Sequence, residues 1–139
     1  MSIGREFMEK TKYENMQDKS AQDKGIRQPG LQKGYDKGVD LINLPDPDIS
    51  TAPVNLKEIV ENRRSLRSYS NQEITMEELS YLLWMTQGIK KEVKGKVTFR
   101  TVPSAGARHA FETYLLINRV KGLEKGIYRY LAIEHKLLP

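Results

Sequence analysis

Two short segments of this sequence carry side chains that could do chemistry, and the first is the run RRSLR at residues 63–67. Three guanidinium groups and one hydroxyl lie within five residues, and arginine presents a planar fork of donors that suits phosphate oxygens. The pattern therefore favours a phosphate site at this segment. A structural role stays open, because the helix dipole alone favours arginine at the C-terminal end of a helix.

The second segment is PSAGARH at residues 103–109. Proline, serine and glycine predict a turn, and small side chains at Ser104–Ala107 would let the backbone approach a flat ligand closely. Arg108 and His109 could supply charge or a proton there, although an ordinary loop before a strand is the alternative. We expect His135 to be an exposed strand residue. The sequence has no phosphate-binding glycine loop, no dinucleotide fingerprint and no metal-ligand spacing, so we predict no metal site.

Two helices are predicted around the first segment. A capping-box pattern at Asn55 and Glu58 starts a helix that should run to about Arg63. Its apolar residues Leu56, Ile59 and Val60 recur at helical spacing and share one face of the helix. A second capping box begins the helix expected over residues 75–88, where a glycine forms a plausible C-terminal stop. These helices should therefore flank the arginine-rich run.

Strands are expected mainly in the second half of the chain. The charged, glycine-containing stretch Lys90–Lys96 predicts a surface loop, and Phe99–Val102 a short extended piece. Thr113–Ile117 is rich in strand formers and nearly all apolar, which is typical of a strand covered on both faces. Gly126–Leu131 and Glu134–Leu138 predict a hairpin. Helices followed by strands indicate an α+β fold.

Residues 1–40 differ from the rest of the 139-residue chain, because they contain few apolar side chains and several glycines. Such a segment buries too little apolar surface to offset its chain entropy. We interpret it as an arm that could wrap a partner, with a short helix near Arg5–Tyr13. The prolines of Leu44–Asp48 predict a stiff extended linker. We therefore divide the chain into an arm and linker, residues 1–52, and a compact domain, residues 53–139, which should begin near Pro53.

Composition narrows the possible functions. The sequence has no cysteine, which excludes a disulfide scaffold, a zinc finger and a thiol nucleophile. No apolar run is long enough to cross a membrane and no leader is evident, so we expect a cytoplasmic protein. The formal net charge is +5, and the basic excess lies in the compact part. This excess could form a solvated surface or a phosphate-ligand site. A nucleic-acid surface is less favoured, because the aromatic and basic residues form no RNA-binding signature.

The two segments in this order, with GLEKGIYRY at residues 122–130, resemble the nitroreductase family of flavoproteins. The resemblance runs from about Asn55 to Pro139 and implies a three-layer α+β fold around a mixed or antiparallel sheet. It implies that the first segment holds the phosphate and ribityl chain of FMN, and that the second faces the flavin of the other subunit in a homodimer. The residues that it assigns to the cofactor are Arg63, Arg64, Ser65, Arg67, Pro103, Ser104, Ala105 and Gly106.

The segment PSAGARH and the residues after it are closest to the SagB-type branch of that family. Ala107 stands where many members have asparagine, and Ala110 and Phe111 replace a Pro-Leu pair common in the branch. The resemblance implies hydride transfer through the flavin between NAD(P)H and a small acceptor, or oxidation of an azoline ring in a modified peptide. It implies no side-chain nucleophile and leaves catalytic residues unassigned, the proton donor included.

Family members continue past the position of Pro139 with a helix and strands that complete the flavin pocket. We therefore expect this chain to cover only the N-terminal part of the fold, as a truncated product or with a second polypeptide supplying the rest. The alternative function is a non-catalytic fragment or subunit that needs another chain. A basic nucleic-acid binder is a weaker third possibility, and we expect no nucleic-acid or membrane partner.

Overall fold

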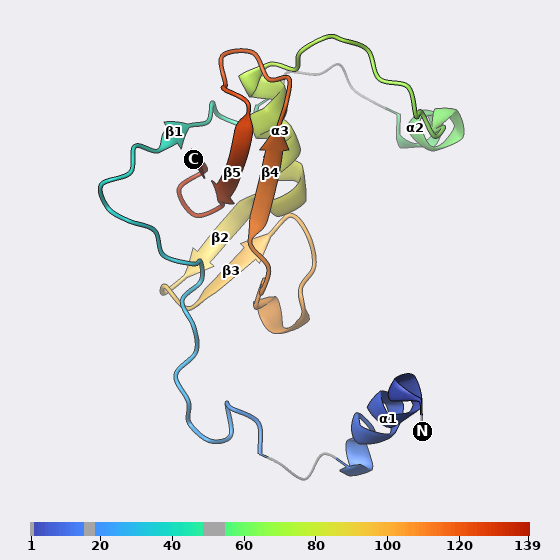
Figure 1. Ribbon diagram of the computed structural model, residues 1–139, viewed down its shortest axis with the longest axis vertical. Coiled ribbons are helices and arrows are strands. Elements are labelled where there is room, and N and C mark those ends of the chain that lie inside the picture. The colour runs from blue at the N-terminus through green and yellow to red at the C-terminus, as the bar shows by residue number, and fades with distance from the viewer. Residues whose placement is uncertain (1, 16–18, 49–54) are drawn as a thin grey trace. The chain divides into compact units, whose positions relative to one another are not determined.

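The computed structural model describes residues 2–15, 19–48 and 55–139. The chain divides into two compact units, Met1–Gly30 and Leu31–Pro139. In the first, helix α1 spans Ile3–Lys10 and a 3-10 turn spans Tyr13–Asn15 (Figure 1). The predicted short helix is thus confirmed, and it buries none of its side chains.

A four-stranded antiparallel sheet forms the centre of the second unit, with the strand order β1-β6-β5-β4. Its strands are β1 (Ile42–Asn43), β4 (Thr113–Ile117), β5 (Gly126–Leu131) and β6 (Lys136–Leu138). Helix α3 (Met76–Gln87) packs against one face of this sheet (Figure 1). The predicted α+β class and the β5–β6 hairpin are therefore confirmed, whereas the third layer remains a prediction.

The core lies between α3 and the sheet. Leu79 and Leu83 of α3 belong to one apolar cluster with Tyr128, Tyr130 and Leu137 of the strands. Because side chains alternate across a strand, every second residue of β4 and β5 faces this helix. Burial of these apolar side chains is the main force that holds the helix on the sheet.

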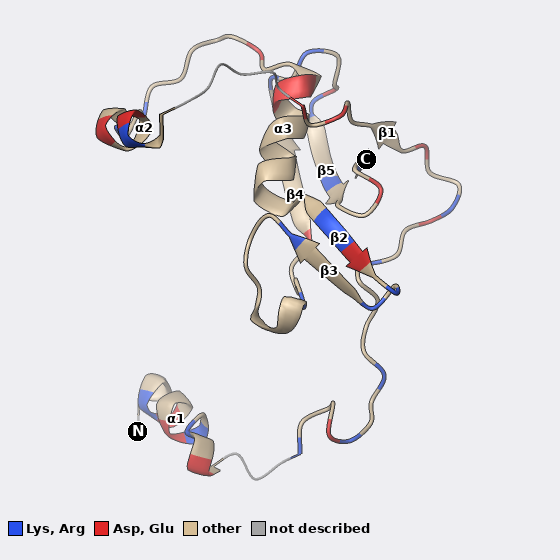
Figure 2. Ribbon diagram, turned by 180° about the vertical axis from the view of Figure 1, so that it is seen from behind, with Lys and Arg blue, Asp and Glu red and all other residues tan. Residues whose placement is uncertain are grey.

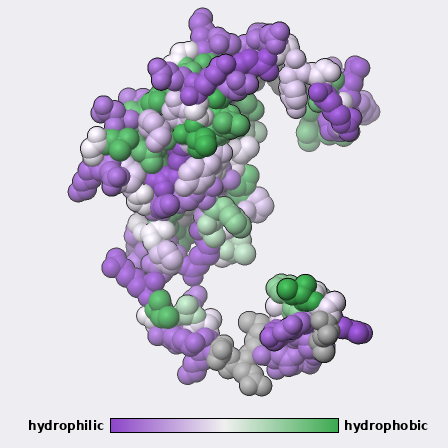
Figure 3. Space-filling model, in the orientation of Figure 1, coloured by the Kyte–Doolittle hydropathy of each residue, from purple (hydrophilic) through white to green (hydrophobic). Residues whose placement is uncertain are grey.

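The other face of β4, together with Ile127 of β5, is largely exposed among the described residues. Tyr114, Leu116 and Ile127 keep 57%, 82% and 67% of their surface exposed. The register pairs Leu116 with Ile127, so these side chains form one apolar surface. Hydrophobic residues reach the molecular surface in the region of the sheet (Figure 3). Our expectation that β4 is covered on both faces is therefore wrong for this part of the chain, because Tyr114 and Leu116 stay largely exposed on this face.

Both predicted helices near the arginine-rich run are present. Helix α2 spans Leu56–Asn62, and the Asn55 side chain accepts a hydrogen bond from the Lys57 backbone nitrogen at 3.0 Å. Helix α3 begins with a complete capping box, in which the hydroxyl of Thr75 and the carboxylate of Glu78 each accept from the other's backbone nitrogen. These contacts satisfy helix N–H groups that would otherwise lack partners.

The stretch that we predicted as a surface loop, Lys90–Lys96, is instead part of a hairpin. Strand β2 (Ile89–Val93) pairs with β3 (Val97–Arg100), which carries the start of the expected extended piece. Charged residues lie along β2, as Figure 2 shows in blue and red. They are compatible with a strand because a two-stranded ribbon leaves most of its side chains in water. The turn has positive φ at Lys94 and Gly95, the pattern of a tight hairpin turn.

The boundary between arm and compact unit also differs from our expectation. We placed it at residue 52, whereas the structure groups residues from Leu31 onward with the sheet. Strand β1 pairs with β6, and Leu44, expected in a linker, is buried in the core. This segment is apolar only at a few positions, but its backbone hydrogen bonds and Leu44 suffice to dock it. The expected start at Pro53 lies outside the described residues.

Candidate functional site

The arginine-rich run directly follows α2. Arg63 forms the C-cap of the helix with extended backbone angles, and residues 63–70 continue without regular structure. Every side chain of the run is exposed. Within the part of the chain that the structure describes, Arg63, Arg64 and Arg67 make no ion pair and no side-chain hydrogen bond. Their guanidinium groups are therefore available to bind an anion.

The chain after this run is tied to the end of β4. Asn71 accepts a hydrogen bond from Arg119 Nη1 at 3.0 Å. Ile74 forms a parallel bridge with Val120, and its backbone nitrogen donates to the Arg119 carbonyl at 3.2 Å. These contacts hold residues 71–74 beside the end of β4, at an edge of the sheet. The arginine-rich run is thus attached to the fold at its C-terminal side by residues 71–74.

A groove lies between this tied segment and β4. Its volume is about 570 Å³. The residues that line it are Tyr69, Ser70, Gln72, Ile74, Leu79, Tyr114, Leu115, Leu116, Ile117, Asn118, Arg119 and Val120. The wall of β4 is mostly apolar, and the opposite wall offers hydroxyl and amide groups. Such a mixture suits a ligand with an apolar body and polar substituents.

The PSAGARH segment is an ordered turn between β3 and β4. Residues 105–107 form a 3-10 turn, and Ser104 Oγ accepts a hydrogen bond from the His109 backbone nitrogen at 2.9 Å. Positive φ angles occur at Gly106, Ala107 and His109. For residues other than glycine this conformation is disfavoured, and such strain clusters at functional positions. Through this hydrogen bond, Ser104 therefore stabilises the disfavoured backbone conformation of the predicted flavin-facing loop.

Burial and neighbouring charges shift the pKa values of His109 and Arg100 near this turn. Burial lowers the pKa of His109, and the charge of Arg100 lowers it further. Burial also lowers the pKa of Arg100, which Glu112 partly offsets. Arg100 is held in place because its Nη1 donates to Gln87 Oε1 at 3.2 Å. Burial and the charge of Arg100 therefore both favour the uncharged form of the His109 ring.

The described residues do not bring the two predicted segments together in one site. No hydrogen bond or ion pair joins residues 63–67 to residues 103–106 in the described parts of the chain. Pro103, Ala105 and Gly106 are exposed, and Ser104 is half-buried. The cofactor roles that we assigned to these residues thus stay predictions.

Our interpretation of His135 is wrong. It lies in the turn before β6 with a φ of 54°, and it joins three segments. Its Nε2 lies 2.7 Å from Ser80 Oγ and its Nδ1 lies 2.8 Å from the Tyr130 hydroxyl. Ser80 also donates to the Pro45 carbonyl oxygen at 2.5 Å. We missed this network because Pro45 and Ser80 lie far from His135 in the sequence, and no local pattern connects them.

Two findings bear on other kinds of site. Among the residues that the structure describes, no group of three or more His, Cys, Asp or Glu side chains could hold a metal ion. None of the described helices has the length and apolar character needed to cross a membrane.

Comparison with known proteins identifies the family. The model of the nitroreductase family matches residues 60–139, which is more than half of the chain. The protein "Putative nitroreductase MJ1384" of Methanocaldococcus jannaschii is 35% identical over 99 residues, which cover 71% of this chain and 47% of that protein. The "Trifolitoxin-processing protein TfxB" of Rhizobium leguminosarum bv. trifolii is 33% identical over 60 residues, 42% of this chain and 16% of that protein. This chain thus spans about half of the first relative and a smaller part of the second. Its match to the family model over residues 60–139 shows that the chain belongs to the nitroreductase family.

Proposed function

We propose that this protein is an FMN-dependent oxidoreductase in which the arginine-rich run binds the phosphate of FMN. Membership of the nitroreductase family indicates an oxidoreductase. The observation that supports the cofactor is the set of three exposed guanidinium groups, Arg63, Arg64 and Arg67, beside the Ser65 hydroxyl. None of these cations is neutralised within the described residues, so a phosphate would supply the missing negative charge.

The residues present fit this cofactor. When bound, FMN supplies hydride acceptance and donation, and the protein binds and orients it. Arg63, Ser65 and Arg67 would hold the phosphate and the ribityl chain, with Arg64 adding positive charge. Residues 103–106 would lie against the ring of a flavin held by a partner subunit, since their small side chains permit close approach of the backbone. Ser104 would keep that loop in shape through its contact with the His109 backbone.

We propose NAD(P)H as the electron donor and a small molecule as the second substrate. That substrate is a small acceptor or, as in SagB-type proteins, an azoline ring in a modified peptide. The second possibility is supported by the similarity over 60 residues to a protein named for the processing of trifolitoxin. The groove beside β4, with one apolar and one polar wall, offers space for an organic substrate.

The proposed assembly is a homodimer with flavin sites between subunits, or a complex with a second chain that completes the fold. The open face of β4 and β5 supports the need for a partner surface, because Leu116 alone leaves 82% of its surface exposed. Large contiguous apolar surfaces on soluble proteins commonly mark interaction sites. The chain spans 47% of the length of the relative from M. jannaschii, so the assembly and the activity of the whole protein are proposals.

The test of the cofactor proposal is a titration of the full chain with FMN, in which quenching of flavin fluorescence measures binding. We expect Arg63→Gln and Arg67→Gln each to weaken binding by about ten-fold or more, since a hydrogen bond to a charged group contributes about 1.5–3 kcal/mol. Arg27→Gln is the matched control, because Arg27 is also exposed but lies outside the run. Equal affinity in all three variants, or no binding of FMN to the unmodified chain, would contradict the proposal.

The second candidate is a non-catalytic subunit that needs another chain to complete the flavin pocket. The exposed apolar face of the sheet favours it, since a lone catalytic domain would gain by covering that face. Steady-state assays with NADPH and a nitro or quinone substrate separate the two functions. Turnover by this chain alone excludes the non-catalytic function, whereas FMN binding without turnover supports it.

A further inference from the structure

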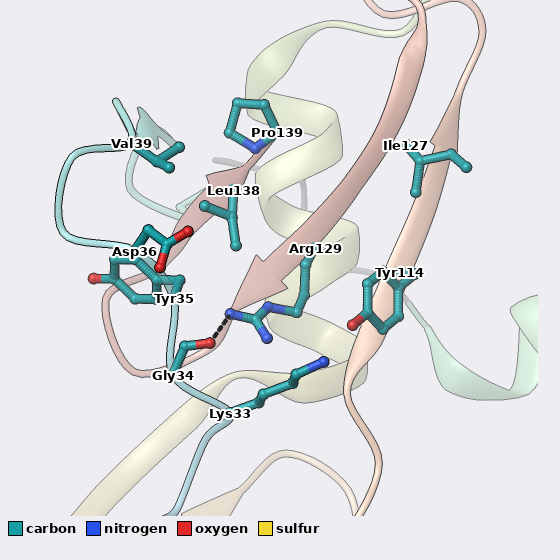
Figure 4. Close-up of a pocket in the computed structure, with 10 residues that line it drawn as sticks. All are labelled: Lys33, Gly34, Tyr35, Asp36, Val39, Tyr114, Ile127, Arg129, Leu138 and Pro139. Atoms are coloured by element: carbon teal, nitrogen blue, oxygen red, sulfur yellow. Dashed lines mark hydrogen bonds between the residues drawn. The ribbon is translucent and has the colours of Figure 1, made fainter.

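A second groove lies on the open side of the sheet, and its lining includes none of residues 63–67. One side is formed by residues 31–39, which we call the strap, and the other by β4 and β5 (Figure 4). Its volume is about 470 Å³. The lining residues are Lys33, Gly34, Tyr35, Asp36, Val39, Tyr114, Ile127, Arg129, Leu138 and Pro139. Nothing in the proposed flavin chemistry uses this groove.

Arg129 is a buried cation without a counter-ion in this groove. Only 5% of its surface is exposed. Its Nη2 donates to the Gly34 carbonyl oxygen at 3.0 Å, and its Nε is buried with no hydrogen-bond partner. No carboxylate of the described residues forms an ion pair with it. A guanidinium group keeps its charge in proteins, so burying one unpaired is costly.

The charges and walls around Arg129 indicate what would neutralise it. Lys33 adds a second positive charge, while Asp36 is the one carboxylate side chain of the lining and makes no ion pair within the described residues. Tyr114 and Ile127 form a largely exposed wall beside the guanidinium group (Figure 4). The side chains of the groove therefore combine two cations and one carboxylate with an apolar surface.

The strap is held in place by specific contacts. Gln32 Nε2 donates to Glu134 Oε2 at 2.7 Å, and the Lys33 backbone nitrogen donates to Glu112 Oε1 at 2.6 Å. The Tyr35 hydroxyl donates to Glu134 at 3.4 Å. Both glutamates are occupied by the strap and so are not counter-ions of Arg129. The groove is thus a built feature of the fold, with its cation left unpaired.

We propose that this groove binds a carboxylate that is attached to an apolar or aromatic body. The carboxylate oxygens would accept from the guanidinium group of Arg129, because arginine binds carboxylates with parallel hydrogen bonds. The body would cover Tyr114 and Ile127, which removes apolar surface from water. The source of the carboxylate is either a free organic acid or an acidic side chain of a polypeptide segment that lies on the open sheet. The proposal does not depend on FMN binding.

The test is a titration of the full chain with phenylacetate in the absence of FMN. Changes in the amide chemical shifts in NMR spectra report binding. Phenylacetamide has the same body without the charge, and we expect it to bind at least ten-fold more weakly. Arg129→Met should abolish binding of the acid. Because Arg129 is buried, that variant can fail to fold, so Ile127→Glu provides a second test. It places a carboxylate on the groove wall from an exposed position, and we expect it to weaken phenylacetate binding at least ten-fold.

Leu116→Glu is the matched control, since Leu116 lies on the same open face but does not line this groove. To identify the source, a short peptide with glutamate between leucines is compared with its glutamine counterpart. Binding of phenylacetate supports a free acid, and binding of the glutamate peptide alone supports a polypeptide source. The proposal is overturned when neither binds, when the uncharged partner of each pair binds equally well, or when Ile127→Glu and Leu116→Glu behave alike.

Discussion

The hydrogen-bond network around His135 leads to a quantitative prediction about stability. Ser80 and Tyr130 are 0% and 2% exposed, and both contact the imidazole ring. Burial raises the pKa of Tyr130 to about 12, so its hydroxyl stays protonated and donates to His135 Nδ1. Ser80 gives its only hydrogen to the Pro45 carbonyl, so Nε2–H of His135 donates to Ser80 Oγ. The neutral ring therefore satisfies both buried hydroxyl groups.

We predict that His135→Asn lowers the free energy of unfolding by about 1–3 kcal/mol, the cost of leaving the buried Tyr130 hydroxyl without a partner. Asparagine is the sharper choice than alanine, because it tolerates the positive φ at this position. Its side chain is too short to replace both contacts of the ring. In a Tyr130→Phe background the same substitution should cost less, since the orphaned hydroxyl is absent.

The same network makes stability depend on pH. Burial lowers the pKa of His135, while the Pro45 carbonyl and Asp46 oppose the shift less strongly. The unfolded chain, with a pKa of about 6.5, then binds a proton more readily than the folded protein. The contribution of neutral His135 to stability is therefore fully present above about pH 6.5. Below that pH the free energy of unfolding falls, by at most about 1.4 kcal/mol per pH unit for one proton. His135→Asn should reduce this slope.

Urea unfolding followed by the fluorescence of Trp84, the single tryptophan, measures both effects between pH 5 and 8. His109→Asn is the matched control, because burial lowers the pKa of His109 as well and it lies outside the network. An unchanged unfolding midpoint for His135→Asn at pH 8 would refute the network as a source of stability. A pH slope equal to that of the unmodified protein would refute the assignment of the titrating group.

Three further predictions concern the core and the helix α3. Thr75→Ala should lower the free energy of unfolding by about 1 kcal/mol because it removes the capping box, and Glu78→Gln, which keeps an acceptor, should cost less. Leu137→Ala should cost about 2–5 kcal/mol, since Leu137 is fully buried between sheet and helix and leaves a cavity. Gly88→Ala should cost about 1–3 kcal/mol, because the added methyl group would collide with the Trp84 carbonyl oxygen and ring. Urea unfolding measures all three effects. For each variant, a change in the free energy of unfolding below about 0.5 kcal/mol would contradict the structural reason given for it.

Local patterns were sufficient for much of the secondary structure. The capping residues at Asn55 and Thr75 mark the starts of α2 and α3 because they act within three residues of chain. The bounds of β4 and β5 match the predicted strands, since β-forming side chains and flanking glycines define them locally. The hairpin β2–β3 was missed because its charged residues imitate a loop, and its Lys94–Gly95 turn carries a weak signal.

The candidate sites show the limits of the same reasoning. The arginine-rich run and the PSAGARH turn were visible as clusters of donors and small residues, and both lie within residues 60–139, which the family model matches. The unpaired cation of Arg129 was not predictable. It depends on the strap, whose Gly34 carbonyl contacts a residue 95 positions away. The sequence of the strap, with its glycines and few apolar residues, predicts an arm instead.

The sequence by itself determined the α+β class, the helix starts, the main strands and the family, because these follow from short-range spacing and from motif order. The tertiary structure alone decided which cations are paired, which apolar face stays open and that His135 joins three segments. These properties depend on contacts between residues 35 to 95 positions apart. Such contacts arise when the chain folds onto the sheet, and no local pattern encodes the partner that each side chain meets.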